Sequence, residues 1–109
     1  MANPWRGEVA LSVDGEARVM RLTLGALAEM EARLKSDSLV EMIARFESGG
    51  FRVRDLISLL TAGLNGGGWG ITEAELVRSR IDGGPLAAAQ AAAALLKVTF
   101  TLPGEDGEA

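Results

Sequence analysis

The sequence predicts a mostly α-helical α+β fold, in which an N-terminal β-hairpin precedes about five helices. Two patterns predict it. Polar and apolar residues alternate on both sides of Asp14-Gly15, and later apolar residues recur at helical spacing between capping residues and glycines. The chain has 109 residues, of which 48% are hydrophobic, so it is long enough to form one packed core. We therefore expect a single globular domain over residues 1–102, with the hairpin at about 8–22 and the helices from about 24 to 101.

The hairpin is centred on Asp14-Gly15, because both residue types tolerate the positive φ that tight hairpin turns need. Two registers are open. A two-residue turn pairs Leu11 with Arg18, whereas a three-residue turn with a glycine bulge pairs Leu11 with Val19 and matches apolar to apolar residues. We expect the second register. Because an isolated hairpin is marginal in water, this one either covers a helical core or pairs through its edge with another chain.

The first two helices are predicted from their ends. Thr23 is a typical N-cap for a helix over 24–34, in which apolar residues recur every three or four positions. Ser38 opens the second helix and Glu41 completes a capping-box pattern. Gly49-Gly50 ends that helix, because a left-handed C-terminal cap favours glycine.

The third and fourth helices follow the same logic. Apolar residues dominate one face of the segment 53–64 and flank it, so we expect this helix to be the most buried. Thr72 and Glu75 form a second capping box, which predicts a fourth helix that runs to about Ile81.

The last helix is predicted over Pro85–Thr101. Most residues of its first half are alanines, so small or apolar side chains cover nearly all of its faces. A helix of this kind is buried on several sides, or its second face meets another chain or an identical subunit. Both alternatives stay open. The segment 103–109 is polar, acidic and glycine-rich, and we expect it to be a disordered tail.

The composition excludes several classes of chemistry. The chain has no histidine and no cysteine, which excludes disulfides, Cys-His or Ser-His-Asp nucleophiles and the usual zinc sites. The glycine run Gly66–Gly70 lacks the lysine of a phosphate-binding loop and is followed by acidic Glu73. The remaining carboxylates are typical of helix starts and solvated faces. We therefore expect no enzyme activity, no cofactor and no metal.

The charge pattern also limits the partners. Net charge is −4, but Glu105, Asp106 and Glu108 lie in the last five residues, and the other 12 acids nearly balance the 11 basic residues. Such a balance is not typical of a nucleic-acid-binding surface. The uncharged stretch 83–96 is too short and too weakly apolar to span a membrane. With no signal-peptide pattern at the N-terminus, we expect a cytoplasmic protein.

Four segments together point to a known family: residues 3–9 (NPWRGEV), 22–31 (LTLGALAEME), 54–56 (RDL) and 61–64 (TAGL). In combination they resemble a small protein of the tail module of gene transfer agents and related long-tailed phages. That family is usually described as a tail assembly chaperone and has also been labelled a tail-tube protein. The resemblance covers about residues 3–100.

The resemblance implies an assembly factor that acts in the host cell, including a host that carries the genes as a prophage. It implies binding to the tape-measure protein, which is kept soluble while tail-tube subunits polymerise around it. The alternative is a structural tail component, such as a tube or terminator subunit, that stays in the particle. Self-association into a homo-oligomer also stays open. The candidate partner-binding residues are Trp69, Leu86, Ala89, Ala93, Leu95, Leu96 and Phe100. Trp69 either folds back onto the core or grips a partner.

Overall fold

The structure, a computed structural model, describes residues 3–34 and 39–100. It confirms the predicted fold class, a β-hairpin followed by five helices. The elements, in chain order, are a 3-10 helix at Pro4–Arg6, β1 (Glu8–Val13), β2 (Glu16–Arg21), α1 (Leu24–Leu34), α2 (Leu39–Ser48), α3 (Val53–Gly66), α4 (Glu73–Arg78) and α5 (Gly84–Phe100). The expected tail at 103–109 lies outside the described residues.

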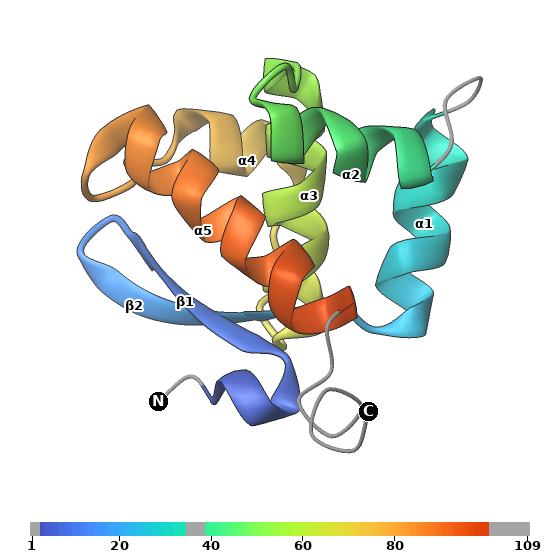
Figure 1. The fold of residues 1–109 in the computed structure, drawn as a ribbon. Coiled ribbons are helices and arrows are strands. Elements are labelled where there is room, and N and C mark those ends of the chain that lie inside the picture. Colours follow the sequence, from blue (N-terminus) through green and yellow to red (C-terminus); the bar gives the residue numbers. More distant parts are fainter. Residues whose placement is uncertain (1–2, 35–38, 101–109) are drawn as a thin grey trace.

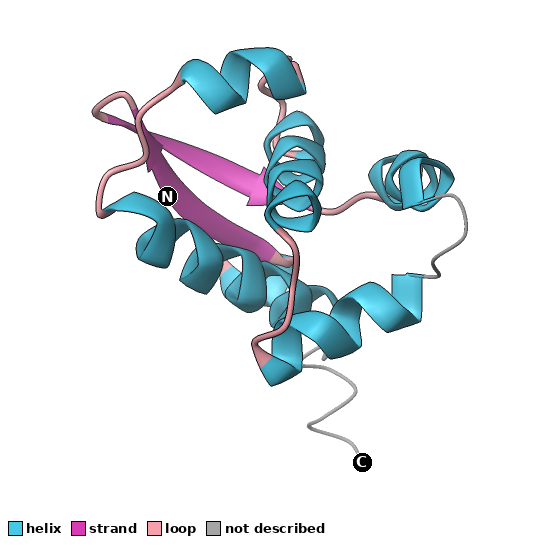
Figure 2. Cartoon of the chain, turned by 90° about the horizontal axis from the view of Figure 1, so that it is seen from above, coloured by secondary structure: helices cyan, strands magenta, loops and turns pink. Residues whose placement is uncertain are grey.

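The helices are layered over one side of the hairpin (Figure 1). α3 packs mainly on β2 and α5 mainly on β1, so these two helices form the layer in direct contact with the strands. α1 and α2 lie at the end of the molecule opposite the hairpin turn (Figure 2). The hairpin therefore covers the helical core, which was one of the two alternatives left open by the sequence.

The hairpin has the register that we did not expect. Asp14 and Gly15 form a two-residue turn with φ of 52° and 82°, and Leu11 pairs with Arg18 rather than with Val19. Positive φ at both turn positions gives a twist that matches the strands. The expected apolar match is not needed, because the Arg18 guanidinium lies over the ring of Trp69, 4.1 Å from its centroid.

The outer edge of β2 is closed by the end of α3. A Cβ on Gly66 would lie 1.8 Å from the carbonyl oxygen of Arg21, and a Cβ on Gly67 would lie 1.9 Å from that of Val19. No side chain fits at either distance, so only glycine lets the helix end approach the strand this closely. Gly66 and Gly67 are thus needed for packing, whereas nothing lies within 4 Å of a Cβ built at Gly68 or Gly70.

The outer edge of β1 is closed near the turn by the segment after α4. Asp14 N–H donates to the carbonyl of Arg80 (2.7 Å), and Asp82 N–H donates to the carbonyl of Ser12 (3.1 Å). Ile81 forms an isolated bridge with Val13. The fourth helix was expected to run to about Ile81, but α4 ends at Arg78, because Ile81 pairs with Val13 of β1 instead.

Local capping signals position the other helix ends as expected. Thr23 Oγ1 accepts a hydrogen bond from the Ala26 N–H (3.0 Å), and Thr72 and Glu75 form the predicted capping box. Gly49 has a φ of 84°, as a left-handed cap after α2 requires. Ser38 of the other predicted capping box lies outside the described residues.

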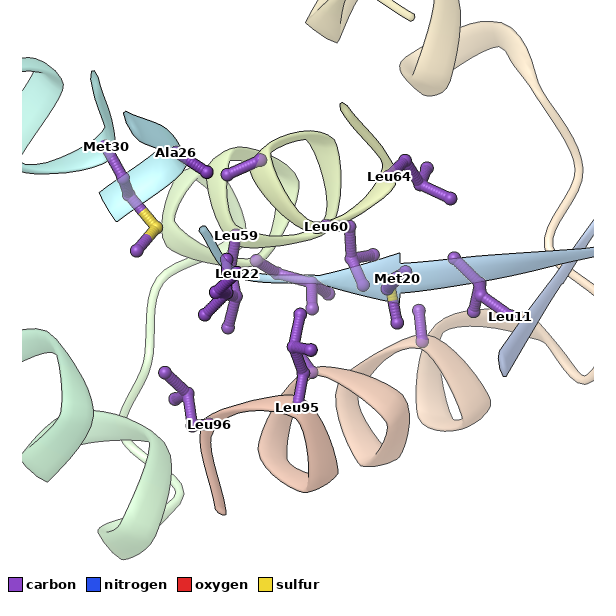
Figure 3. Close-up of a cluster of buried hydrophobic side chains, with 14 of the residues drawn as sticks. Leu11, Met20, Leu22, Ala26, Met30, Leu59, Leu60, Leu64, Leu95 and Leu96 are labelled. Carbon is purple, nitrogen blue, oxygen red and sulfur yellow. The ribbon is translucent and has the colours of Figure 1, made fainter. Parts of the chain in front are cut away.

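The core lies between α3, α5 and the hairpin (Figure 3). Leu59 and Leu60 of α3 and Leu95 of α5 point into the space beside β2. Gly63 allows the crossing, because a Cβ there would lie 2.6 Å from Cδ2 of Leu95. α3 is the most buried helix, as predicted. Other core side chains labelled in the figure are Leu11, Met20, Leu22, Ala26, Met30, Leu64 and Leu96.

Candidate interaction surface

α5 is buried along one side and exposed along the other. Ala88, Ala92, Leu95 and Leu96 are buried. Leu95 is 0% exposed and Leu96 5% exposed. These two leucines were among the candidate partner contacts. The structure buries both in the core, where α5 packs against β1 and α3, and Leu96 also lines the groove described below.

The exposed side of α5 carries a continuous seam. It consists of Leu86, Gln90, Ala93, Lys97 and Phe100, all exposed. Leu86 is 69% exposed and Phe100 45% exposed, so the two large apolar side chains of the seam lie at its ends. The spacing of four, three, four and three residues keeps all five on one face, as in the seam of a coiled coil.

A groove adjoins the C-terminal half of this seam. It encloses about 370 Å³ between α2 and α5. Its lining residues are Ile43, Phe46, Glu47, Ala93, Leu96, Lys97 and Phe100. We call this the α2–α5 groove. Its walls are mainly apolar, with one acid on α2 and one base on α5, so its chemistry suits an amphipathic helix.

Three contacts hold α2 in the position that forms this groove. Met42 and Phe46 are buried, and the Phe46 ring stacks on Phe51 with centroids 4.7 Å apart. The guanidinium of Arg45 lies 2.9 Å from a carboxylate oxygen of the buried Asp55 at the start of α3. This ion pair ties α2 to α3 across the loop between them.

Hydrogen bonds from two arginines offset the cost of burying the Asp55 carboxylate. Burial by itself raises its pKa, but hydrogen bonds from the Arg45 side chain and from the backbone and side chain of Arg52 outweigh burial. Together they hold the pKa of Asp55 below its ordinary value of 3.8. The carboxylate is therefore ionised at neutral pH and has a structural role.

A second apolar groove of about 360 Å³ lies at the other end of α5. We call it the α3–α4 groove. Leu56, Ile57 and Leu60 of α3 face Leu76 and Val77 of α4 across it. Pro85 and Ala88 close it where α5 begins. Both grooves thus border α5, one at each end.

Trp69 folds back onto the core, which was the first of its two alternatives. The residue is half-buried and lies under the Arg18 guanidinium. The loop around it is fixed by Asn65, whose side-chain amide donates to the carbonyl of Ile71 (2.9 Å) and accepts from its N–H (3.2 Å).

The described residues contain no group of three or more His, Cys, Asp or Glu side chains that could hold a metal ion. No helix among them is long and apolar enough to cross a membrane. Among residues 3–34 and 39–100, we take the seam and the two grooves as the candidate binding surface, because the structure brings exposed apolar side chains of α5 next to these grooves.

The comparison with known families agrees with the resemblance seen in the sequence. A family described as "Phage tail tube protein, GTA-gp10" matches residues 6–101, from the 3-10 helix to the end of α5. The chain belongs to this family. No curated protein and no solved structure matches it.

Membership of the GTA-gp10 family makes the chain a tail-related protein of gene transfer agents, whose expected partners are other tail proteins. The structure brings three of the candidate residues, Ala93, Leu96 and Phe100, into the α2–α5 groove. Leu86 and the half-buried Ala89 lie on α5 before it, and Trp69 packs against the hairpin. Sequence analysis missed Ile43 and Phe46, the α2 wall of the groove. Their apolar spacing was visible, but their neighbour on α5 was not.

Proposed function

We propose that this GTA-gp10 family member is a tail assembly chaperone that binds the tape-measure protein in the host cytoplasm before the tail tube encloses it. The observation that carries the proposal is the exposed seam of α5 beside the α2–α5 groove. A long helical protein that awaits its tube exposes apolar stripes, and a groove of this kind accepts such a stripe by the helix-in-groove mode. The proposed role needs no catalysis.

The hairpin supports a helix-binding role over a strand-pairing one. A subunit that builds a β-barrel with its neighbours must offer free strand edges. Here Gly66 and Gly67 cover the edge of β2, and Arg80–Asp82 covers the turn end of β1. Strand addition at the edge of β2, or at the turn end of β1, would have to displace these contacts, whereas a helix can reach the exposed side of α5 in the single chain.

The proposal is tested by co-expression with the tape-measure protein of the same tail. We expect the wild-type chain to keep the tape measure soluble and to co-purify with it. Ala93→Glu puts a carboxylate on the seam and should weaken binding by about tenfold or more, because burying an unpaired charge costs over about 1.4 kcal/mol. Ala74→Glu is the matched control, since Ala74 is exposed on α4 outside the lining of either groove. A tape measure that stays insoluble with or without the wild-type chain would contradict the proposal.

A structural tail component is the second candidate, and the description of the family, which names a tail tube protein, favours it. Mass spectrometry of purified particles separates the two roles. A chaperone should be absent or far below the copy number of the tube subunit. Several copies per ring of the tail would establish the structural role and refute the chaperone.

A further inference from the structure

The hydrogen-bond pattern of the hairpin determines which backbone groups face the outer edge of β1, away from β2. Because the turn has two residues, Val13 and Glu16, which flank it, are joined by hydrogen bonds. In an antiparallel pair of strands every second residue is bonded in this way. The residues between them, Glu8, Ala10 and Ser12, therefore direct their N–H and C=O groups to the outer edge.

Two contacts agree with this geometry and close the ends of the edge. At the start of β1, the Glu8 N–H donates to the carbonyl of Asn3 (3.1 Å). Near the turn, the Ser12 carbonyl accepts from the Asp82 N–H (3.1 Å). Four groups between these contacts have no hydrogen-bond partner among the described residues: the carbonyl of Glu8, both backbone groups of Ala10 and the N–H of Ser12. Ala10 is exposed, so this stretch, which we call the β1 window, is open to solvent.

An exposed tryptophan lies at the start of the β1 window. Trp5 belongs to the 3-10 helix that precedes and contacts β1, and it is 74% exposed. Asn3 fixes the backbone beneath it: its carbonyl accepts from the Arg6 N–H (2.9 Å), and its Oδ1 accepts from the Trp5 N–H (3.0 Å). The Asn3 N–H in turn donates to Oε1 of Glu8 (2.8 Å). The chain thus holds an indole in water at the edge of β1, and tryptophan is one of the residues that contribute most to binding when a partner covers it.

We propose that the β1 window and Trp5 together bind an extended segment of another tail protein, which adds to β1 as a third strand. The segment donates to the carbonyls of Glu8 and Ala10 and accepts from the N–H groups of Ala10 and Ser12, which makes four hydrogen bonds. One of its apolar side chains covers the indole. Binding here leaves the exposed seam of α5 free, so it is independent of the site proposed for the tape-measure protein.

The surroundings of the window define the chemistry of the segment. On the helix side of the sheet its side chains lie next to Val9 and Leu11, so they should be apolar at every second position. At the start of the window two exposed arginines, Arg6 and Arg21, outnumber one acid, Glu8. A segment with an acidic residue at that end complements this charge.

A second copy of this chain fits the window less well than a single segment does. α5 packs mainly on β1, so two copies paired through β1 would carry their α5 helices on strands about 4.8 Å apart, whereas packed helices need about 8–10 Å. Five residues span only about 17 Å of strand, and the contact is far smaller than a stable dimer requires. One window also accepts only one strand, so it does not make the hairpin a barrel-building unit.

Synthetic peptides that cover the other proteins of the same tail test the proposal. They overlap, have about 15 residues, longer than most strands, and carry a fluorescein label, so that anisotropy measures their binding to the purified chain. We expect at least one peptide to bind with a Kd of about 100 µM or tighter. Trp5→Ala and Ala10→Pro should each weaken it about tenfold or more, because the first removes the indole and the second removes an N–H from the window.

Ala17→Pro is the matched control. Ala17 is exposed on β2 and lies opposite Ser12 in a pair without hydrogen bonds, so proline there also removes an N–H that is not part of the β1–β2 ladder. This variant should bind the peptide as wild type does. Ala93→Glu, on the seam of α5, should also leave the affinity unchanged. Circular dichroism checks that all four variants keep the helix content of wild type.

Amide hydrogen exchange followed by NMR gives a measurement that needs no variant. The amides of Ala10 and Ser12 should exchange about tenfold more slowly or less when the peptide is bound, whereas the amide of Leu11, already bonded within the hairpin, should not change. The proposal is wrong if no peptide binds, if Ala10→Pro and Ala17→Pro weaken binding equally, or if both window amides keep their exchange rates. Protection that rises with the concentration of the chain alone would make a second copy the occupant and would also overturn it. None of these results changes the co-expression test of the tape-measure protein.

Discussion

Replacing Gly66 by alanine tests whether the glycine run closes the edge of the sheet. Gly66 ends α3 in a helical conformation that alanine adopts readily. By intrinsic propensity alone, the substitution stabilises a helix by about 0.5–1 kcal/mol. The structure predicts the opposite sign, because the new Cβ would lie 1.8 Å from the carbonyl oxygen of Arg21.

The magnitude follows from what has to move. Real Cβ atoms are not found within 3.0 Å of such a neighbour, so the end of α3 must separate from β2 by about 1.2 Å. Both sides of this contact are backbone, which cannot rotate away as the tip of a side chain can. Overpacking costs about 1–3 kcal/mol, and a rigid contact falls at the upper end. After the propensity gain is subtracted, we expect a net loss of about 2 kcal/mol.

Gly25→Ala is the matched control, because Gly25 is also helical and the nearest atom to its new Cβ, Oγ1 of Thr23, is 3.9 Å away. It should stabilise the chain by about 0.5–1 kcal/mol. Both variants are compared with wild type by urea denaturation, followed by circular dichroism and by tryptophan fluorescence, in which the half-buried Trp69 becomes exposed on unfolding while Trp5 is already exposed. The loss at Gly66 should lower the melting temperature by about 8 °C or more.

The stabilities of Gly66→Ala and Gly25→Ala together decide whether the end of α3 closes the edge of β2. If Gly66→Ala is as stable as wild type, or gains stability as Gly25→Ala does, the glycine run is a flexible connector and the edge of β2 is not closed by it. The argument against strand addition would then lose one of its two supports. A loss at Gly66 with a gain at Gly25 leaves steric contact as the explanation.

Three further substitutions test the packing around the interaction surface. Gly63→Ala should cost about 1 kcal/mol, less than Gly66→Ala, because the tip of Leu95 can move; urea denaturation measures it. Arg18→Ala should cost about 1 kcal/mol and shift the Trp69 emission, since it removes the cation from the ring. Asp55→Asn should cost about 2 kcal/mol at pH 7. Because the folded pKa of Asp55 is lowered, its contribution is present at neutral pH and is lost as the pH falls below 3.8, so the gap between wild type and variant should close there.

The parts of the fold that sequence predicted are those set by local chemistry. α1 begins after Thr23, whose hydroxyl oxygen accepts a hydrogen bond from the N–H of Ala26, three residues later. This interaction needs no other element of the fold. The left-handed conformation of Gly49 is equally local. The predicted hairpin register was wrong because it relied on matching apolar residues across the strands, whereas the two-residue turn at Asp14-Gly15 sets the register. Arg18 then finds partners in Glu16 and in the ring of Trp69, which lies 51 residues further along the chain.

The interaction surface was only half predictable for a related reason. The last helix is apolar nearly all round, so its sequence does not distinguish the side of Leu95 from the side of Leu86. The packing of α5 against β1 and α3 decides which side is buried: the side of Leu95 is buried and the side of Leu86 is exposed. The α2 wall was missed because the ion pair between Arg45 and Asp55, which holds α2 in place, joins residues of two different helices.

The composition of the exposed seam argues for reversible rather than permanent binding. Ala93, at its centre, offers little apolar area, so it can face water at little cost and still allow close approach of another helix. The larger side chains, Leu86 and Phe100, stand about 21 Å apart at the two ends. A subunit that stays in a particle buries extensive apolar surface, often over 2,000 Å². A seam with two large apolar side chains and an alanine at its centre offers less apolar area than that. This fits the chaperone role proposed above, in which the partner is released when the tube closes around it.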